Sequence, residues 1–249
     1  MIALQLYTVR ERTAQDFIGT LRQLADMGYR TLEFAGYGDT PVTELRSAME
    51  EFGLRAISAH VPFIQLENSP QQMIEDLHIL GCKHAVVPGI PEERRSTVEQ
   101  VRGLADTFNG LGQTCHDEGL QFGYHNHAHE FEPLDGSTMF ELIAENTDPA
   151  LVNLELDLFW AQYGGTDPIG LMRKYAGRMP LLHCKDMLDD TEHSDAPVGA
   201  GILPYQDYLR LGSEIGVEWY IVEQDHPRNA MEDVRTSLRN LEGLTQAAK

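Results

Sequence analysis

The chain has 249 residues, 42% hydrophobic side chains and a formal net charge of −20. Its length suits one α/β barrel, and no apolar run approaches the roughly 18 residues that a membrane span needs. The acidic balance argues against a nucleic-acid partner, because like charges repel. The first residues lack a leader pattern and the three cysteines lack a metal-like spacing, so we expect a cytoplasmic protein with reduced thiols.

A glycine recurs between an amphipathic segment and the short apolar run that follows it. It lies at Gly28, Gly53, Gly81, Gly119 and Gly216. Glycine just past a helix end takes the left-handed conformation without a Cβ clash. We therefore expect five helix-to-strand turns.

Helix starts are marked by a capping side chain followed by proline. The pairs are Thr40-Pro41, Ser69-Pro70 and Asp167-Pro168, and Gln72 could form a capping box with Ser69. Apolar residues at helical spacing follow in two segments. They are Val42, Leu45, Met49 and Phe52 in the first, and Met231, Val234, Leu238 and Leu241 in the second.

Eight apolar runs alternate with these helical segments. They cover about residues 2–8, 31–35, 55–60, 84–88, 121–127, 152–159, 180–186 and 218–225. Alternation predicts a parallel sheet, and eight units of about 31 residues favour a closed (β/α)₈ barrel over a doubly wound sheet. No linker interrupts the pattern, so we expect a single domain over 1–249.

The sixth run, VNLELDLFW, carries acids on one face. Because strand side chains alternate, Leu154 and Leu156 share one face, while Glu155 and Asp157 share the other. The leucine face suits packing under helices, which turns the acids into the barrel. Carboxylates there are costly unless they are paired or bind metal. For Asp157 the alternative is a structural ion pair with Lys185.

Neighbouring runs place more polar side chains at the same end of the barrel. His125 lies late in the fifth run, His183 in the seventh and Glu223 in the eighth. We expect His125, Asp157, His183 and Glu223 to hold one divalent metal ion. Two imidazoles and two carboxylates suit Mn²⁺, Co²⁺, Fe²⁺ or Zn²⁺ better than Ca²⁺ or Mg²⁺.

Five motifs together resemble the xylose-isomerase-like barrel superfamily. They are YHNHAHEF (124–131), LELDLFW (154–160), LHCKD (182–186), PVGAG (197–201) and VEQD (222–225). Within it they are most similar to the sugar phosphate isomerase/epimerase branch, which includes inosose dehydratases, hydroxypyruvate isomerase and ketose 3-epimerases.

The resemblance implies one divalent ion, for which Mn²⁺ is our first expectation. Asp157, His183 and Glu223 match the family's ligands. His125 falls where ketose 3-epimerases carry a glutamate, which disfavours ordinary ketose 3-epimerisation. Trp160 stands where several relatives have a histidine, which suggests a different substrate contact.

The chemistry that the resemblance implies is proton removal next to a carbonyl. Glu223 is the first candidate base, and His127 is the second unless it only hydrogen-bonds a ligand. Lys185 either stabilises an oxyanion or neutralises Glu155. These assignments give three candidate catalytic residues: Glu223, His127 and Lys185.

Further residues at the same end are candidates for substrate binding. They are Glu33, His60, Glu130, Glu155 and Trp160. Glu130 could instead cap a loop, and Trp160 could instead pack beneath one. Gly199 and Gly201 could present N–H groups to an anion, although a tight turn fits them better.

The favoured function is a metal-dependent isomerase or epimerase of a sugar. The main alternative is a lyase that dehydrates an inosose or eliminates from a 3-keto sugar or glycoside. A nuclease related to endonuclease IV is disfavoured by the acidic surface, and a metal-free binding barrel by the buried acids. We expect a small sugar or sugar derivative as partner, no nucleic acid and no membrane. A homodimer is compatible with the sequence, although no apolar surface stripe requires one.

Overall fold

The computed structural model describes residues 1–247, in which eight parallel strands close into a barrel. In the order in which they pair, the strands are β1 (Ile2–Gln5), β2 (Thr31–Phe34), β3 (Arg55–His60), β4 (His84–Val87), β5 (Gln121–His125), β8 (Val152–Asp157), β9 (Leu181–Cys184) and β12 (Trp219–Val222). The barrel closes where Ile2 of β1 pairs with Tyr220 of β12. The expected (β/α)₈ barrel is confirmed.

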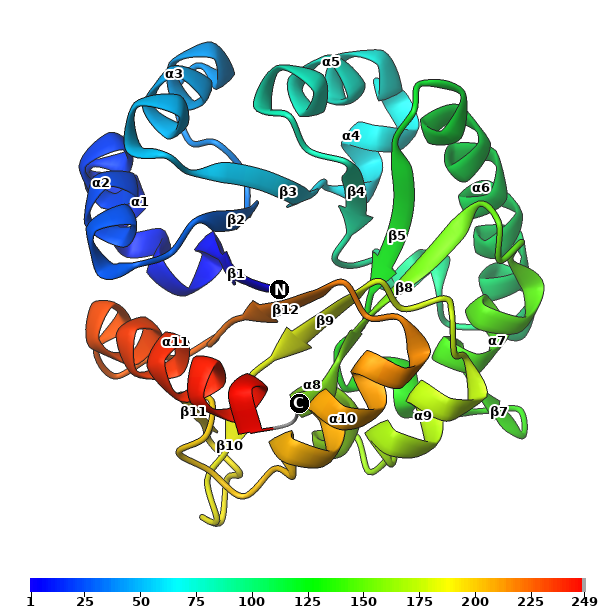
Figure 1. Ribbon diagram of the computed structural model, residues 1–249. Coiled ribbons are helices and arrows are strands. Elements are labelled where there is room, and N and C mark those ends of the chain that lie inside the picture. Colours follow the sequence, from blue (N-terminus) through cyan, green and yellow to red (C-terminus); the bar gives the residue numbers. More distant parts are fainter. Residues whose placement is uncertain (248–249) are drawn as a thin grey trace.

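Helices surround the barrel on its outside (Figure 1). They are α1 (Arg10–Gln15), α2 (Phe17–Met27), α3 (Val42–Phe52), α4 (Phe63–Asn68), α5 (Pro70–Leu80), α6 (Val98–Asp117), α7 (Met139–Asn146), α8 (Leu158–Tyr163), α9 (Pro168–Lys174), α10 (Tyr205–Ile215) and α11 (Ala230–Ala247). Three short 3₁₀ helices are η1 (Leu6–Val9), η2 (Glu92–Arg94) and η3 (His129–Phe131). No helix among residues 1–247 is long and apolar enough to cross a membrane.

Several strands end earlier than their apolar runs predicted. Residues 6–9 form η1 instead of continuing β1, and residues 158–159 open α8 instead of continuing β8. At the second site the cause is visible, because the Asp157 carboxylate accepts a hydrogen bond from the backbone N–H of Trp160. Asp157 therefore ends the strand and caps the following helix.

The predicted turns are largely confirmed. All five glycines have positive φ, from 69° at Gly53 to 120° at Gly28. Asp167 caps α9 as expected. The expected cap at Thr40 is wrong, because Pro41 is the N-cap residue of α3 and no side chain makes a cap bond there. The Ser69 capping box is wrong, because Ser69 makes no side-chain cap bond and Gln72 donates to Asp76 instead.

The inside of the barrel is divided into two layers. Near the N-terminal ends of the strands lies a small apolar cluster of Ala3, Ile57, Val86, Leu181, Trp219 and Ile221. Leu181 and Ile221 are each followed two residues later by an inward polar group, His183 and Glu223. The alternation of strand side chains thus places polar residues in a second layer, toward the C-terminal ends.

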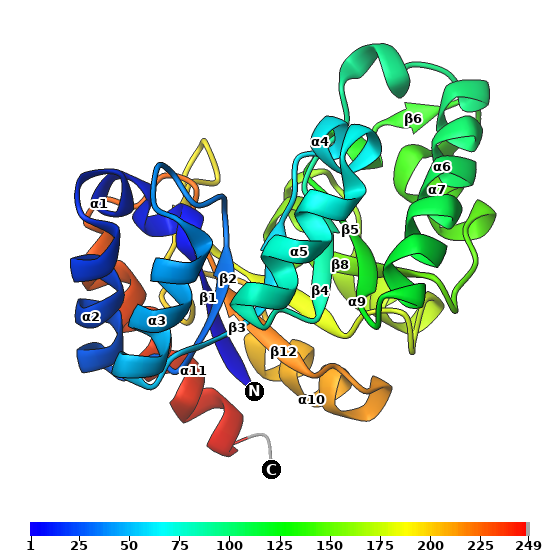
Figure 2. The ribbon, with the colours of Figure 1, turned by 90° about the horizontal axis from the view of Figure 1, so that it is seen from above.

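Two short hairpins extend the strand ends. One is β6 (Pro133–Leu134) with β7 (Ser137–Thr138), and the other is β10 (Asp186–Met187) with β11 (Asp195–Ala196). Figure 2 shows the N-terminus and the later turns of α11 at one end of the molecule, with β6 and α4 at the other. The hairpins therefore shape the end that holds the polar layer.

The three cysteines are free and buried. Burial raises the pKa of the Cys115 thiol to about 11 and that of Cys184 to about 12. Thiols with such pKa values stay protonated near neutral pH and are poor nucleophiles. This agrees with the expectation of reduced cysteines that serve as small buried side chains.

Candidate active site

The four expected metal ligands come together in the polar layer, toward the C-terminal ends of the strands. Ligand atoms of His125, Asp157, His183 and Glu223 all lie within 4.8 Å of one another, and the four side chains are buried. We call these four residues the outer cluster. Nδ1 of His183 lies 2.9 Å from a Glu223 oxygen, and Nε2 of His125 lies 4.0 Å from a carboxylate oxygen of Asp157.

A second group lies directly against the first. Ligand atoms of His60, His125, Glu155 and His183 also lie within 4.8 Å of one another, and we call this set the inner cluster. Nε2 of His60 lies 2.7 Å from a Glu155 oxygen. On sequence alone we expected His60 and Glu155 to contact substrate. In the structure the two side chains contact each other.

Two histidines belong to both clusters, and each turns one ring nitrogen to each side. Nδ1 of His183 faces Glu223, while its Nε2 lies 2.6 Å from Glu33. Nε2 of His125 faces Asp157, while its Nδ1 lies 3.2 Å from Glu155. Glu33 therefore orients the His183 ring by a hydrogen bond, as outer partners do for metal-bound histidines, whereas Glu155 lies near His125 without a hydrogen bond to its Nδ1.

Glu33 is held entirely within this network. Its carboxylate accepts hydrogen bonds from the Gln5 amide, at 2.8 Å, and from the Ser58 hydroxyl, and it contacts His183. The residue has no exposed surface. The structure therefore places Glu33 behind the histidines and not at a surface that a hydroxyl group could reach.

Lys185 is the permanent positive charge of the polar layer. Its ammonium lies 2.9 Å from Asp157, 2.8 Å from Glu223 and 2.8 Å from Asp225. The expected ion pair with Asp157 is present, whereas the expected neutralisation of Glu155 is not observed. The reason is geometric, since Lys185 follows His183 by two residues and lies higher in the barrel than Glu155.

The polar layer holds more acid than its lysine can neutralise. Four buried carboxylates (Glu33, Glu155, Asp157 and Glu223) and the half-buried Asp225 face one ammonium, and the pKa of His183, which burial alone would lower, is raised well above its usual value by Glu155, Glu33 and Glu223. Burial raises the pKa of Asp157 to about 6, against the opposing effect of Lys185. One buried oxygen of Glu155 has no hydrogen-bond partner among residues 1–247. A buried excess of carboxylate with imidazole donors fits a divalent cation.

The mouth of the barrel is formed by His127 and Trp160. The two rings lie 5.9 Å apart, and the Lys185 ammonium lies 5.5 Å from the Trp160 ring centroid. Burial, and then the charge of Lys185, lower the pKa of His127 to about 4. His127 is thus a neutral, partly exposed imidazole beside the outer cluster.

Glu130 acts as a loop cap in this structure. Its carboxylate accepts a hydrogen bond from the Tyr124 hydroxyl and, at 2.7 Å, one from the backbone N–H of His127. The side chain is fully buried. Of the two roles expected for Glu130, the geometry supports the cap and leaves no surface for a hydroxyl contact.

The PVGAG segment does bind an anion, and this anion is a side chain of the chain itself. The Asp186 carboxylate accepts hydrogen bonds from the backbone N–H groups of Met187, Gly199, Gly201 and Leu203, at 2.8 to 3.0 Å. A Cβ on Gly201 would clash with Asp186 and with the carbonyl oxygen of Met187. The segment is therefore the tight turn that we expected as the simpler alternative.

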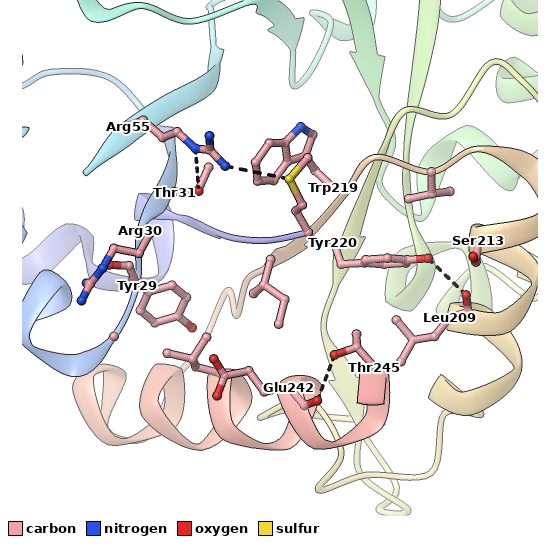
Figure 3. A pocket seen from close by; sticks show the side chains of 15 residues that line it. Tyr29, Arg30, Thr31, Arg55, Leu209, Ser213, Trp219, Tyr220, Glu242 and Thr245 are labelled. Atoms are coloured by element: carbon pink, nitrogen blue, oxygen red, sulfur yellow. Dashed lines mark hydrogen bonds between the residues drawn. The ribbon is translucent and has the colours of Figure 1, made fainter. Parts of the chain in front are cut away.

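A separate hollow of about 560 Å³ lies at the opposite end of the barrel, between β12, α10 and α11 (Figure 3). There the Arg55 guanidinium lies over the Trp219 ring and donates to Thr31, and the Tyr220 hydroxyl donates to the Leu209 carbonyl. These polar groups hold neighbouring elements together. In barrels of this kind the N-terminal end serves stability, whereas chemistry lies at the C-terminal end.

Sequence reasoning missed several residues of the polar layer. Gln5 and Ser58 hold Glu33, Asp225 pairs with Lys185, and Asp186 anchors the PVGAG turn. Strand alternation could have pointed to Gln5, because it follows Ala3 on the inward face. Asp225 lies in the VEQD motif, two residues after Glu223, and the same argument applies to it.

A parallel eight-stranded barrel with a buried histidine–carboxylate cluster at the C-terminal ends of its strands has the architecture of a barrel enzyme, in which the chemistry lies at that end. The chain belongs to the family described as the xylose isomerase-like TIM barrel, whose model matches residues 21–244. Its relatives are enzymes of the sugar isomerase, epimerase and dehydratase kind.

The most similar curated proteins include inosose dehydratases. One from Geobacillus kaustophilus is 28% identical over 192 residues, which is 68% of this chain and 62% of that protein. One from Bacillus anthracis is 33% identical over 187 residues, 67% of this chain and again 62% of that protein. The chain therefore matches somewhat less than two thirds of the length of these relatives.

Solved structures share the fold along nearly the whole chain. A sugar phosphate isomerase/epimerase from Parabacteroides distasonis has a TM-score of 0.86 at 26% identity, covering 98% of this chain and 94% of that one. A structure described as the IOLI protein with a binding zinc atom has a TM-score of 0.81 at 18% identity, covering 100% and 99%. At that lower identity the second likeness shows the fold alone.

Proposed function

We propose that this chain is a divalent-metal-dependent lyase that removes water from a cyclic keto-polyol such as an inosose. The cluster of buried carboxylates beside two imidazoles carries this proposal, because such a donor set at the C-terminal end of the barrel suits a divalent cation. Similarity to inosose dehydratases supports the reaction class. It also favours the lyase over the isomerase or epimerase that ranked first on sequence alone.

His125, Asp157, His183 and Glu223 would hold the ion. When bound, a divalent ion there supplies Lewis-acid polarisation of a substrate carbonyl. The donor set suits Mn²⁺, Co²⁺, Fe²⁺ or Zn²⁺, and Mn²⁺ remains our first expectation. Glu33 would act as a positioning residue through the far nitrogen of His183.

His127 is the proposed acid–base residue. Its pKa of about 4 keeps the ring neutral near pH 7, so that it can accept the proton from the carbon next to the carbonyl. The imidazolium that results is a strong acid and returns the proton to the hydroxyl group on the next carbon. The C–O bond then breaks, water leaves and a C=C bond forms. Glu223, the other expected base, already contacts Lys185 and His183.

Lys185 would carry out two tasks in this scheme. Its ammonium balances Asp157, Glu223 and Asp225, and these acids hold the pKa of Lys185 well above its usual value although burial alone would lower it. A permanently charged ammonium cannot act as a base. It can stabilise negative charge that develops on a substrate oxygen close to the outer cluster.

The test combines metal analysis with NMR in D₂O. Protein loaded with Mn²⁺ or Zn²⁺ is incubated with scyllo-inosose, and loss of water is followed. We expect Asp157→Asn to lose stoichiometric metal, and His127→Gln to keep the metal but lose activity at least 100-fold. His129→Gln is the matched control, since His129 is another half-buried histidine, two residues further along, whose ring stacks on His127.

A second candidate is an isomerase or epimerase, favoured by the 26% identical Parabacteroides structure. The same NMR experiment separates the two, because deuterium gain with all hydroxyls retained indicates isomerase or epimerase chemistry. Stoichiometric metal in Asp157→Asn would contradict the ligand assignment. Absence of both exchange and water loss across inososes, ketoses and 3-keto glycosides would overturn both candidates.

A further inference from the structure

The ring nitrogens of the inner cluster converge on one carboxylate oxygen of Glu155. Nε2 of His60 lies 2.7 Å from this oxygen, and Nδ1 of His125 and Nε2 of His183 each lie 3.2 Å from it. An oxygen of Glu33 lies 3.3 Å from His60 and 2.6 Å from His183. Ligands around an ion with bonds of about 2.0–2.2 Å are about 2.8–3.6 Å apart, so small movements would let these atoms surround one ion.

Two buried donor atoms of the inner cluster have no hydrogen-bond partner among residues 1–247. They are Nδ1 of His125 and the second carboxylate oxygen of Glu155, and each residue is only 1% exposed. A buried polar atom that lacks a partner typically costs about 1–3 kcal/mol. A cation that accepts the lone pairs of both atoms would remove this cost.

The inner cluster also has the form of a closed site. Structural metal sites are surrounded by protein ligands, whereas catalytic sites keep one position open to water or substrate. His125, Glu155 and His183 are buried, and the His60 side chain, at 10% exposure, is the most accessible member. The outer cluster, in contrast, lies beside the mouth of the barrel.

Charge balance is consistent with two ions in the polar layer. Its five carboxylates carry five negative charges, and Lys185 compensates one of them. Two divalent ions would compensate the other four while every imidazole stays neutral. Protons on His60 and His183 are the alternative, since burial alone would lower the pKa of both rings but the neighbouring acids raise it. The two cases differ in the number of ions that the protein binds.

We propose that the inner cluster is a second divalent-cation site, of the closed structural kind, which takes an ion such as Zn²⁺. Three imidazole nitrogens with carboxylate oxygens suit Zn²⁺ better than Mg²⁺ or Ca²⁺. His125 and His183 then bridge the two ions through opposite ring nitrogens, and each bridging ring releases its N–H proton to solvent. The second ion exceeds the single ion that the sequence implied, and it does not depend on the proposed reaction.

The inner ion should bind more weakly than the outer one. It has to displace the 2.7 Å contact between His60 and Glu155 and the 2.6 Å contact between His183 and Glu33. Isothermal titration calorimetry of the chelator-stripped full chain with Zn²⁺ measures both events. We expect two binding phases of one ion each, with the second at least ten-fold weaker than the first.

The residue test uses His60→Phe and His60→Gln. The phenylalanine keeps an aromatic ring where the His60 ring stacks on His183 at 5.2 Å, but it lacks the nitrogen ligand. We expect both variants to lose the second phase and to keep the first within three-fold in affinity, which also shows that they fold. His84→Gln is the matched control, since His84 is a buried histidine outside both clusters, and it should keep both phases.

A crystal of the Zn²⁺-saturated protein locates the second ion by anomalous scattering. We expect it between Nε2 of His60 and Nδ1 of His125. A single binding phase in the parent protein, a second phase that persists in both His60 variants, or a second ion bound only by surface carboxylates would each overturn the proposal.

This test is separable from that of the proposed function. Metal that remains after excess ion is removed, its loss in Asp157→Asn, and turnover of scyllo-inosose report on the outer cluster. The second phase reports on the inner cluster. Two phases without turnover would reject the lyase and leave the inner site, whereas turnover with a single phase would reject only the inner site.

Discussion

Lys185 has an unusual position for a lysine, because it is fully buried among three carboxylates. Truncation of one partner in a buried ionic group leaves charge without compensation, which typically costs about 3–5 kcal/mol. We expect Lys185→Met to lower the free energy of unfolding by about that amount in EDTA, and by less in excess Zn²⁺, because a bound cation replaces part of the lost charge.

Urea denaturation measures this effect, and Lys174→Met is the control. Lys174 is 45% exposed and pairs with Glu141 and Glu145 on the surface, where such pairs contribute about 1 kcal/mol or less. Equal losses in the two variants, or the same loss for Lys185→Met with and without Zn²⁺, would show that Lys185 does not balance the acids of a cation site.

His84 gives a pH dependence that can be tested apart from the active site. Its side chain at the start of β4 is 4% exposed, and burial lowers its pKa. The folded pKa is thus below the unfolded value of about 6.5, so the unfolded chain takes up the proton first. Stability that is present above pH 6.5 is therefore lost as the pH falls through this value.

We expect His84→Gln to show a smaller fall in melting temperature between pH 7.5 and 5.5 than the parent protein does, with both in EDTA. His116→Gln, at a site whose side chain is 67% exposed, should keep the parent's slope. If His84→Gln and the parent lose stability in parallel, His84 is not the group that titrates.

At the scale of elements, the β10–β11 hairpin and the PVGAG turn depend on one carboxylate. Asp186 accepts four backbone N–H groups, and its removal would leave buried donors without partners at about 1–3 kcal/mol each. We expect Asp186→Ala to destabilise the protein by at least about 3 kcal/mol and to expose residues 188–204 to limited proteolysis first.

Asp190→Ala is the matched control for this loop. Asp190 caps the turn of the hairpin through the backbone N–H of Ser194, in an exposed position. It should change proteolysis of the hairpin tip only slightly. Protection of residues 188–204 in Asp186→Ala at the parent level would show that the turn is held by other contacts.

The elements themselves followed from sequence patterns because their causes are local. Glycine at a helix end, proline at a helix start and apolar periodicity each act within a few residues, and they predicted the helices and strands closely. Strand ends were less predictable. Asp157 ends β8 with its own side chain, a choice that alternation alone does not reveal.

At the scale of the whole molecule, the closed barrel brings together side chains that lie far apart in sequence. Alternation predicted that His125, Asp157, His183 and Glu223 would share one end, and the structure groups them there. Alternation could not predict which carboxylate pairs with which histidine ring. Glu33 and His183 are 150 residues apart, and their 2.6 Å contact depends on closure and register across the barrel.

The net charge of −20 predicts how salt acts on the folded chain. Repulsion among surface carboxylates opposes the compact state, and salt screens it. We expect the melting temperature to rise by several degrees as NaCl increases from about 0.02 to 0.3 M, since about 1 kcal/mol corresponds to 2–4 °C at this size. A flat or falling melting temperature in a calorimetric salt series would contradict net self-repulsion.

The three buried thiols provide internal probes of local opening. Cys82 precedes β4, Cys115 lies in α6 and Cys184 ends β9, so they sample three sectors of the barrel. A thiol-specific reagent can reach each of them only when its sector opens, since the folded thiols are covered and protonated. The order in which the three thiols react would therefore rank the sectors by how readily each one opens locally. No cysteine has to be introduced by mutation for this measurement.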